Sequence, residues 1–350
     1  MRTYHHTIPP TARRYVKPRS AQRGDLEDAP STDRAGAALA GARPGESGAM
    51  IQSIADFGYK PFSRLDALQT GVTEWQWREL LRKQRIHRLA YGIYAVAVPD
   101  DDRLSMCQLT CARMLRKTDH FALGASAVAI HDLPNPYFRR WGRIPVTLGG
   151  PRSQPRRGIR RSTVVPVPSD WGAVIDLVDC ARQIAAELPL PQALMVTDAV
   201  ARRIAGTTDR FALASERVRL EVRRLLTEVL SVPALVRSDP AAESPGESFY
   251  RGHMLLTGLP EPRCGVPLLG RSGRRFFADM MLDGLIIEID GLGKYQRGGP
   301  TALIDEKRRE DDLRAAGHDF HRAFVTDIYA DPQAAMRELH DRIRWARRSA

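Results

Sequence analysis

The segment Asp279-Met-Met-Leu-Asp-Gly-Leu-Ile-Ile-Glu288-Ile-Asp290-Gly291 places carboxylates at the ends and on one face of an apolar run. Residues 285–289 are short, β-branched and apolar, which predicts a buried central strand. Because side chains alternate along a strand, Glu288 should face away from its two apolar neighbours. Asp290 should then end the strand, immediately before a glycine turn.

Carboxylates on a buried strand need a cationic partner, because burying an unpaired charge is costly. Hard cations such as Mg²⁺ are bound by oxygen ligands and keep several waters, so this arrangement suits a divalent metal. Salt bridges between the two strand acids and neighbouring arginines are the alternative. The strand alone does not decide between these interpretations.

The flanking sequence predicts a definite order of elements. Upstream, Ser244 and Glu247 have capping-box spacing, which predicts a helix with Glu247 in its first turn. Downstream, residues 306–313 form a charged helical segment, and a strand-like stretch follows Gly317. The predicted order is helix, strand pair, acidic strand, helix, strand.

This ordered set resembles the very-short-patch-repair-like endonuclease domains of unknown function. These belong to the restriction-endonuclease-like, or PD-(D/E)xK, superfamily. The resemblance covers roughly residues 240–345. The matching residues are Glu247, Ser248, Arg251, Gly258 to Pro262, Asp279, Glu288, Asp290, Gly291, Lys294, Tyr295, Lys307, Arg308 and Gly317.

The resemblance implies a Mg²⁺ site with Glu247, Asp279 and Glu288 as metal ligands. Its catalytic residues would be Asp279, Glu288, Asp290 and Lys294. The metal would lower the pKa of a bound water, and the lysine would orient the nucleophile. The superfamily pattern has a lysine two residues after the second acid, where this chain has Asp290. A Mg²⁺-dependent endonuclease and a domain that only grips DNA therefore both remain open.

Composition agrees with a nucleic-acid partner. The 350 residues suffice for two or three domains with separate cores. Lys and Arg number 53 against 41 Asp and Glu, a formal net charge of +12, and a basic excess favours polyanions through counterion release.

We find no apolar run of membrane-spanning length and no signal-peptide pattern, so we expect a cytoplasmic protein without a membrane partner. The four scattered cysteines, whose spacing suits neither zinc nor disulfides, are expected to be buried free thiols.

Residues 1–49 are rich in Pro, Ala, Gly, Ser and Arg and lack regular apolar spacing, which predicts a disordered extension. Ordered-looking sequence begins immediately after Met50. A flexible extension and a true start at Met50 are both consistent with this change.

From residue 50 to residue 100 the pattern predicts three short helices and a β-hairpin, a winged helix-turn-helix. Ser63 caps the second helix, and the third helix runs from Thr73 to Gln84 and should enter the DNA major groove. Trp77, Leu80 and Leu81 should pack inward. The residues left to contact double-stranded DNA are Gln76, Arg78, Arg82 and Lys83 on the helix and Arg85 and Arg88 on the wing. A merely solvated charged face is the alternative.

The same segment resembles the N-terminal domain of AbiEi-type antitoxins, transcriptional autoregulators of toxin–antitoxin and phage-defence operons. The matching residues are Phe62 to Leu68, Gly71, Val72, Arg78, Leu80 to Arg82, Leu89 to Gly92, Ile93 and Tyr94. That family usually has a glycine before the wing, where this chain has Gln84. The resemblance implies a nucleotidyltransferase-like toxin as a partner.

Residues 101–238 predict a mixed α/β middle domain that resembles, more weakly, the C-terminal part of the same antitoxins. His120 and His131 are expected in the core or at helix ends. The arginine-rich turn 152–161 is either a phosphate clamp or a solvated loop. The pattern predicts strands over 143–148 and 161–167 and helices over 104–115, 122–130, 175–188, 194–203 and 210–229.

The sequence thus predicts an α/β multidomain protein in which an endonuclease-like domain, 239–350, follows the winged helix and the middle domain. We expect a DNA-binding protein of the antitoxin or transcriptional-regulator kind. The alternative is a metal-dependent DNA endonuclease of repair or phage defence, targeted by the winged helix. The sequence does not specify the DNA site or the oligomeric state.

Overall fold

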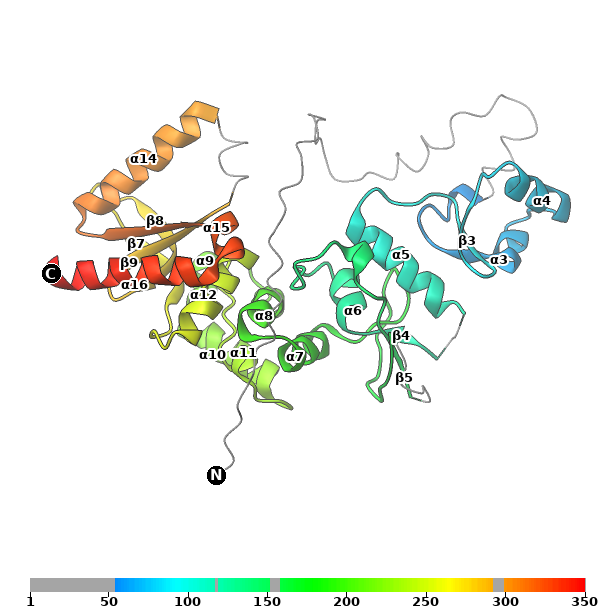
Figure 1. Ribbon diagram of the computed structural model, residues 1–350, viewed down its shortest axis with the longest axis horizontal. Coiled ribbons are helices and arrows are strands. Elements are labelled where there is room, and N and C mark those ends of the chain that lie inside the picture. The colour runs from blue at the N-terminus through cyan, green and yellow to red at the C-terminus, as the bar shows by residue number, and fades with distance from the viewer. Residues whose placement is uncertain (1–53, 117–118, 152–157, 292–298, 350) are drawn as a thin grey trace. The chain divides into compact units, whose positions relative to one another are not determined.

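The computed structural model describes residues 54–116, 119–151, 158–291 and 299–349 (Figure 1). They form a mixed α/β structure with three separate sheets. The predicted extension 1–49, most of the arginine-rich turn and Lys294 lie outside the described residues. Within the described ranges, no helix combines the length and the apolar character needed to cross a membrane.

Within the described residues, the N-terminal part has two capped helices joined by a tight turn and one small antiparallel sheet of order β1-β3-β2. The predicted first helix begins outside these residues, and its described part is helical at Ile54 and Ala55. Ser63 and Thr73 cap the two helices through complete capping boxes. Gly71 adopts a φ of +91° in the turn between them. The elements are β1 (Phe62–Ser63), α3 (Arg64–Gln69), α4 (Glu74–Arg82), β2 (His87–Ala90) and β3 (Ile93–Ala95).

A small apolar core lies between these helices and the sheet. Trp77 and Leu80 are buried in it, as predicted, but Leu81 is 39% exposed, so its predicted inward packing was wrong. On α4, Leu81 is one residue beyond Leu80, about 100° further round the helix, which turns it towards solvent. Helix α4 ends at Arg82, two residues before the predicted end.

The middle part, residues 101–238, has one three-stranded sheet of order β4-β5-β6 and mainly helices. The predicted helices exist, but 210–229 is interrupted because Ser215 caps a new helix there. The predicted strands 143–148 and 161–167 were largely wrong, since each contains a proline, Pro145 or Pro166, that cannot donate a ladder hydrogen bond. The elements are α5 (Asp102–Met114), β4 (Phe121–Ala122), α6 (Gly124–Ile130), η1 (Trp141–Arg143), β5 (Leu148–Gly150), β6 (Ile159–Arg161), α7 (Leu177–Glu187), α8 (Leu190–Ile204), α9 (Arg210–Leu213), α10 (Glu216–Thr227) and α11 (Pro233–Val236).

The C-terminal part has the predicted order of elements around a four-stranded sheet, β10-β9-β8-β7. Strands β7, β8 and β9 are antiparallel, whereas β10 is parallel to β9 and α14 makes the crossover between them. Every residue of β9 is buried, which confirms the predicted central strand. The elements are α12 (Pro245–Leu256), β7 (Arg263–Leu269), β8 (Arg275–Leu282), β9 (Leu285–Asp290), α14 (Gly299–Ala315), β10 (Asp319–Phe324), α15 (Val325–Ala330) and α16 (Pro332–Ser349).

Two cores cover this sheet. Ile287 packs in one core with Tyr250 of α12 and Leu339 of α16. Ile286 packs in the other with Leu313 of α14. Because these two strand neighbours point to opposite faces, helices cover β9 from both sides and explain its continuous burial.

Three of the four cysteines, Cys107, Cys180 and Cys264, are buried free thiols as predicted, and Cys111 is half-buried. His120 is buried. His131 is the C-cap residue of α6, and its Nε2 atom lies 2.7 Å from the Ile175 carbonyl oxygen. Both histidines therefore have the core and helix-end positions expected for them.

Candidate functional site

Asp279 of β8 and Glu288 of β9 come next to each other where the two strands separate. The last paired residues before them are Met280 and Ile287. Beyond this pair, an Oδ2 atom of Asp279 accepts a hydrogen bond of 2.9 Å from the Ile289 amide. The Asp279 carboxylate thus satisfies a backbone donor of the acidic strand.

Glu247 approaches the same strands from the first turn of α12. Its amide donates to Ser244 Oγ at 3.2 Å, and its Oε2 atom accepts from the Glu243 amide at 2.9 Å, so the predicted capping is present with the second bond shifted by one residue. Burial raises the pKa of Glu247 to about 8, and the nearby negative charge of Asp279 adds to this rise. The buried Glu247 carboxylate and the half-buried Asp279 carboxylate therefore repel each other.

Glu288 has an arginine partner on α14. Arg309 Nη2 lies 2.7 Å from Glu288 Oε1, and the Glu288 side chain is only 3% exposed. Arg309 also donates to the Phe277 carbonyl oxygen and to Glu306, each at 3.0 Å. Burial opposes the charge of Arg309, but the hydrogen bond and charge of Glu288 outweigh it and raise the arginine pKa.

Asp290 has a second arginine beside it. Arg322 Nη1 of β10 lies 3.4 Å from Asp290 Oδ2. The other terminal nitrogen of Arg322 lies 2.8 Å from Glu306 and 3.0 Å from Glu310 of α14. The ion pairs therefore form one network across β9, β10 and α14, as the salt-bridge interpretation of the sequence predicted.

The predicted metal ligands Glu247, Asp279 and Glu288 only partly fit a metal site. In the part of the chain that the structure describes, no three Asp, Glu, His or Cys side chains are grouped as metal ligands. The Glu247 and Asp279 pair has the mutual repulsion that a bound cation would relieve. Glu288 fits the set only if it leaves Arg309. Lys294 lies outside the described residues.

The predicted DNA-contact residues of α4 differ in whether their side chains already bind other groups of the protein. Gln76 accepts a hydrogen bond from the Thr73 amide at 2.8 Å, so its side chain belongs to the helix cap. Arg82 makes two bonds of 2.8 Å to Glu79, whose pKa the hydrogen bond from Arg82 lowers to about 2. Lys83 Nζ lies 3.3 Å from the same glutamate. Arg78 is exposed and makes no ion pair within the described ranges.

The wing residues complete the predicted set. Arg88 is exposed, and its guanidinium lies 5.4 Å from the ring centre of Tyr91, which is 77% exposed. Arg85 is half-buried at the end of α4. Among the exposed cations of this group, Arg82 and Lys83 are paired with Glu79, whereas Arg78 and Arg88 make no ion pair within the described residues.

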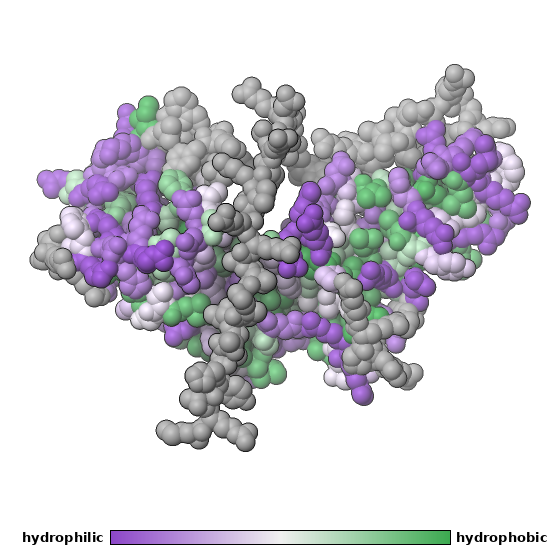
Figure 2. Space-filling model, in the orientation of Figure 1, coloured by the Kyte–Doolittle hydropathy of each residue, from purple (hydrophilic) through white to green (hydrophobic). Residues whose placement is uncertain are grey.

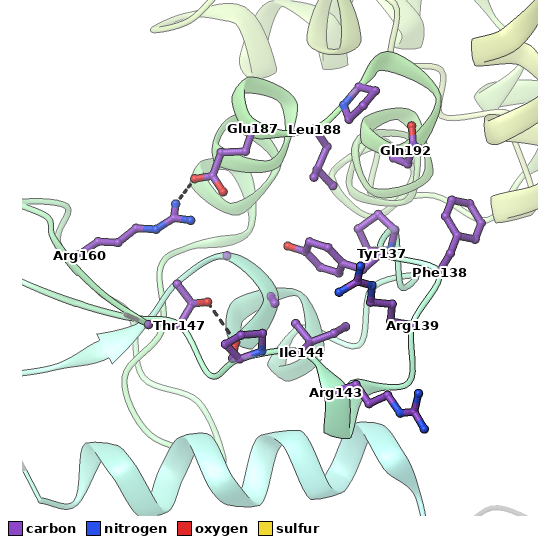
Figure 3. Close-up of a pocket in the computed structure, with 16 residues that line it drawn as sticks. Tyr137, Phe138, Arg139, Arg143, Ile144, Thr147, Arg160, Glu187, Leu188 and Gln192 are labelled. Atoms are coloured by element: carbon purple, nitrogen blue, oxygen red, sulfur yellow. Dashed lines mark hydrogen bonds and ion pairs between the residues drawn. The ribbon is translucent and has the colours of Figure 1, made fainter. Parts of the chain in front are cut away.

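A cavity in the middle part escaped the sequence analysis. Its volume is about 550 Å³, and it lies between α6, the loop 136–147 and the α7–α8 junction. Figure 3 shows the Tyr137 hydroxyl pointing into it and Arg160 paired with Glu187 at one side. Arg143 points away from it (Figure 3). The residues come from distant segments without a shared spacing, so no local pattern in the sequence predicts the cavity.

Comparisons with known proteins leave the family open. No protein-family model matches the chain, and no curated protein matches it either.

Proposed function

We propose that this protein binds double-stranded DNA through a winged helix-turn-helix and regulates transcription in the manner of an AbiEi-type antitoxin. The observation that carries the proposal is the arrangement of the N-terminal part. Helices α3 and α4 are joined by a tight turn and followed by a two-stranded hairpin, which pairs with β1 in the order β1-β3-β2. This order supports a winged helix with α4 as the recognition helix.

The side chains of α4 support the same use. Trp77 and Leu80 fix the helix to the core, while Arg78 on the outer surface can reach bases or phosphates. Glu79 holds Arg82 and Lys83, and DNA would compete with this glutamate for both cations. Because exposed ion pairs contribute little to stability, releasing them would cost little.

The acidic site favours binding over hydrolysis. Arg309 and Arg322 neutralise Glu288 and Asp290, and the position of the superfamily lysine is occupied by Asp290. We therefore propose that the C-terminal domain, with its endonuclease-like order of elements, serves mainly as an additional DNA grip. A toxin gene next to this one would favour the antitoxin form of the proposal.

DNA binding can be measured by fluorescence anisotropy with a duplex from upstream of the protein's own gene. The variant Arg78→Ala/Arg88→Ala should bind that duplex at least tenfold more weakly, as expected for loss of base or phosphate contacts worth about 1 to 3 kcal/mol. Arg217→Ala/Arg224→Ala removes two exposed arginines of α10 and serves as the charge-matched control. Equal affinities of the two variants would remove α4 and the wing from the interface.

A second candidate function is a Mg²⁺-dependent DNA endonuclease. The close Glu247 and Asp279 carboxylates favour it, because a divalent cation between them would relieve their repulsion. Glu247, Asp279 and Glu288 would hold the metal, which would supply an activated water. Nicking of supercoiled plasmid in Mg²⁺ or Mn²⁺ that is lost in Glu288→Gln would establish this activity. Intact plasmid at millimolar concentrations of both ions would eliminate it.

A further inference from the structure

The hairpin between β7 and β8 presents arginines that neither the winged helix nor the acidic site uses. Arg271, Arg274 and Arg275 are all exposed. None of the three makes an ion pair with any residue in the described ranges of the chain. The tip itself, residues 270–274, contains only glycine, serine and arginine, so it has no apolar side chain to insert into a lipid layer or a protein groove.

Asp312 of α14 holds this tip in place. Its carboxylate accepts from the Ser272 amide at 2.8 Å and from Ser272 Oγ at 2.5 Å. The Asp312 carbonyl oxygen accepts from the Arg271 amide at 3.3 Å. A Cβ atom on Gly270 would lie 2.3 Å from Asp312 Oδ2, so only glycine allows this close approach.

Two of the arginines stack on aromatic rings. Arg274 lies over Phe276 at 5.7 Å and Arg275 lies over Phe211 at 5.8 Å, measured from the guanidinium carbon to the ring centre. Phe211 is 46% exposed and packs edge-on against Phe277 at 4.9 Å. A guanidinium that rests on a ring still has its N–H groups in the ring-parallel plane available to an outside acceptor.

The hairpin tip also lies near the acidic network. Asp312, which holds the tip, follows Arg309 by three residues on α14, less than one helical turn. Arg309 in turn binds Glu288. The exposed surface over α14 is mainly hydrophilic in the view of Figure 2.

We propose that the β7–β8 hairpin is a separate phosphate-binding element that grips the backbone of double-stranded DNA independently of base sequence. Planar guanidinium groups bind phosphate oxygens in pairs, and a tip fixed before binding loses little conformational entropy when the ligand arrives. The inference rests on the proposed function in assuming that the protein binds DNA. It goes further in assigning a second contact far from α4 in the sequence, which reads no bases.

The test uses the full-length protein and two duplexes of unrelated sequence, with affinity measured over a series of salt concentrations. Arg271→Ala/Arg274→Ala should weaken binding to both duplexes by the same factor. It should also reduce the slope of log affinity against log salt by about 2, because each lost phosphate contact removes about 0.9. Arg217→Ala/Arg224→Ala on α10 carries the same loss of charge and should keep the wild-type slope.

Two acid variants test the role of the fixed tip. Asp311→Ala and Asp312→Ala each remove one negative charge from neighbouring positions of α14, but only Asp312 holds the tip, while Asp311 pairs with Lys307. Simple electrostatics predicts that both variants bind DNA slightly more tightly. We expect Asp312→Ala to bind DNA severalfold more weakly than Asp311→Ala. Without Asp312 the tip is no longer fixed, so Arg271 and Arg274 must be ordered during binding, at a cost in conformational entropy.

The outcomes separate this inference from the proposed function. If the hairpin variant matches its α10 control in slope and affinity while the wild type binds DNA, the hairpin assignment is wrong and the winged helix is unaffected. If the hairpin variant fails on both duplexes while Arg78→Ala/Arg88→Ala binds normally, the hairpin assignment holds and the winged-helix proposal fails. A wild type without affinity for either duplex at low salt overturns both.

Discussion

A single glutamine lies at the bend between the end of α4 and the β2–β3 hairpin. Gln84 has a φ of +51°, the left-handed region that glycine adopts without strain. The Arg85 amide donates to the Leu80 carbonyl oxygen at 2.9 Å and the Gln84 amide to that of Leu81 at 3.1 Å, which is the Schellman pattern of helix ends. The chain thus keeps the bend for which the resembling family uses glycine.

Replacing this residue should stabilise the protein. We expect Gln84→Gly to raise the free energy of unfolding by about 1 kcal/mol, since a left-handed residue with a Cβ costs about 1–2 kcal/mol and glycine loses part of that gain through its flexible unfolded state. Urea denaturation measures the change. Gln84→Ala keeps the Cβ atom and should stay near the wild type; equal stabilisation by both variants would mean that strain is not the cause.

Variants of the Glu288–Arg309 ion pair test whether Glu288 serves as a salt-bridge partner or as a metal ligand. Arg309→Ala breaks the ion pair with the buried Glu288, so we expect the free energy of unfolding to fall by about 3 kcal/mol in the absence of metal. Arg309→Ala/Glu288→Gln removes both charges and should recover part of that loss. If the acids can hold a cation, millimolar Mn²⁺ should raise the melting temperature of Arg309→Ala more than that of the double variant. The same Mn²⁺ response in both would exclude Glu288 as a ligand.

His321 should make stability depend on pH. It is buried on β10, with Nε2 2.9 Å from the Tyr250 hydroxyl, and burial together with the charge of Arg342 lowers its pKa from 6.5 to about 4. The unfolded chain therefore takes up this proton at higher pH than the folded one. Stability should be lost as pH falls from about 6.5 towards 4, with this histidine contributing about 2 kcal/mol of loss by pH 5.

The comparison variant for this histidine is His321→Gln, which can keep a hydrogen bond to Tyr250 but takes up no proton. Urea midpoints at pH 7 and pH 5 should therefore differ less in His321→Gln than in the wild type. His87→Gln, at an exposed position of β2, should retain the wild-type difference. A wild-type difference that survives His321→Gln would assign the pH dependence to other groups.

At the scale of elements, the C-terminal part could be predicted because each piece carries a local signal. The β-branched run of β9 and the cap at Ser244 identify a strand and a helix within a few residues. The partners of the acids could not be predicted in the same way. Arg309 and Arg322 follow Glu288 and Asp290 by 21 and 32 residues, and only the crossover of α14 brings them together.

The middle part was harder because its strands are short and paired by tertiary context. Strands β5 and β6 have three residues each, too few to show an alternating pattern, and they pair in parallel. The two strands predicted there were inferred from apolar residues that lie mostly in loops. Val165, for example, is 80% exposed. Burial decided by distant segments overrode local propensity in this region.

At the scale of the whole molecule, α8 belongs to two cores. Val196 and Val200 pack in the core of the middle part, whereas Met195 packs in the core of the C-terminal part. Gly252 of α12 lies so close to α8 that a Cβ atom there would be 2.4 Å from the Pro191 Cα atom. These contacts cross residue 239, where the sequence predicts a domain boundary.

Buried charges cross the same boundary. Arg251 of α12 is fully buried and makes two bonds of 2.8 Å to Asp198 of α8. Arg219 of α10 pairs with Asp239 at 3.1 Å and donates to the Cys264 carbonyl oxygen of β7 at 2.7 Å. A C-terminal fragment without α8 and α10 would keep Arg251 and its 3.4 Å contact with Glu261 but lose both bonds to Asp198, and breaking a buried ion pair costs about 3–5 kcal/mol.

We therefore expect that residues 239–350 do not fold alone, whereas residues 101–350 do. The shorter fragment loses Asp198 and exposes the surface of α12 that α8 covers, a combined cost comparable to the 5–15 kcal/mol stability of an entire domain. Circular dichroism during thermal unfolding should show a cooperative transition for 101–350 and none for 239–350. Arg251→Met in the shorter fragment removes the arginine that has lost Asp198, so partial recovery of folding in that variant would assign the defect to the lost Arg251–Asp198 ion pair. A cooperative transition in the unmodified short fragment would instead establish residue 239 as a true domain boundary.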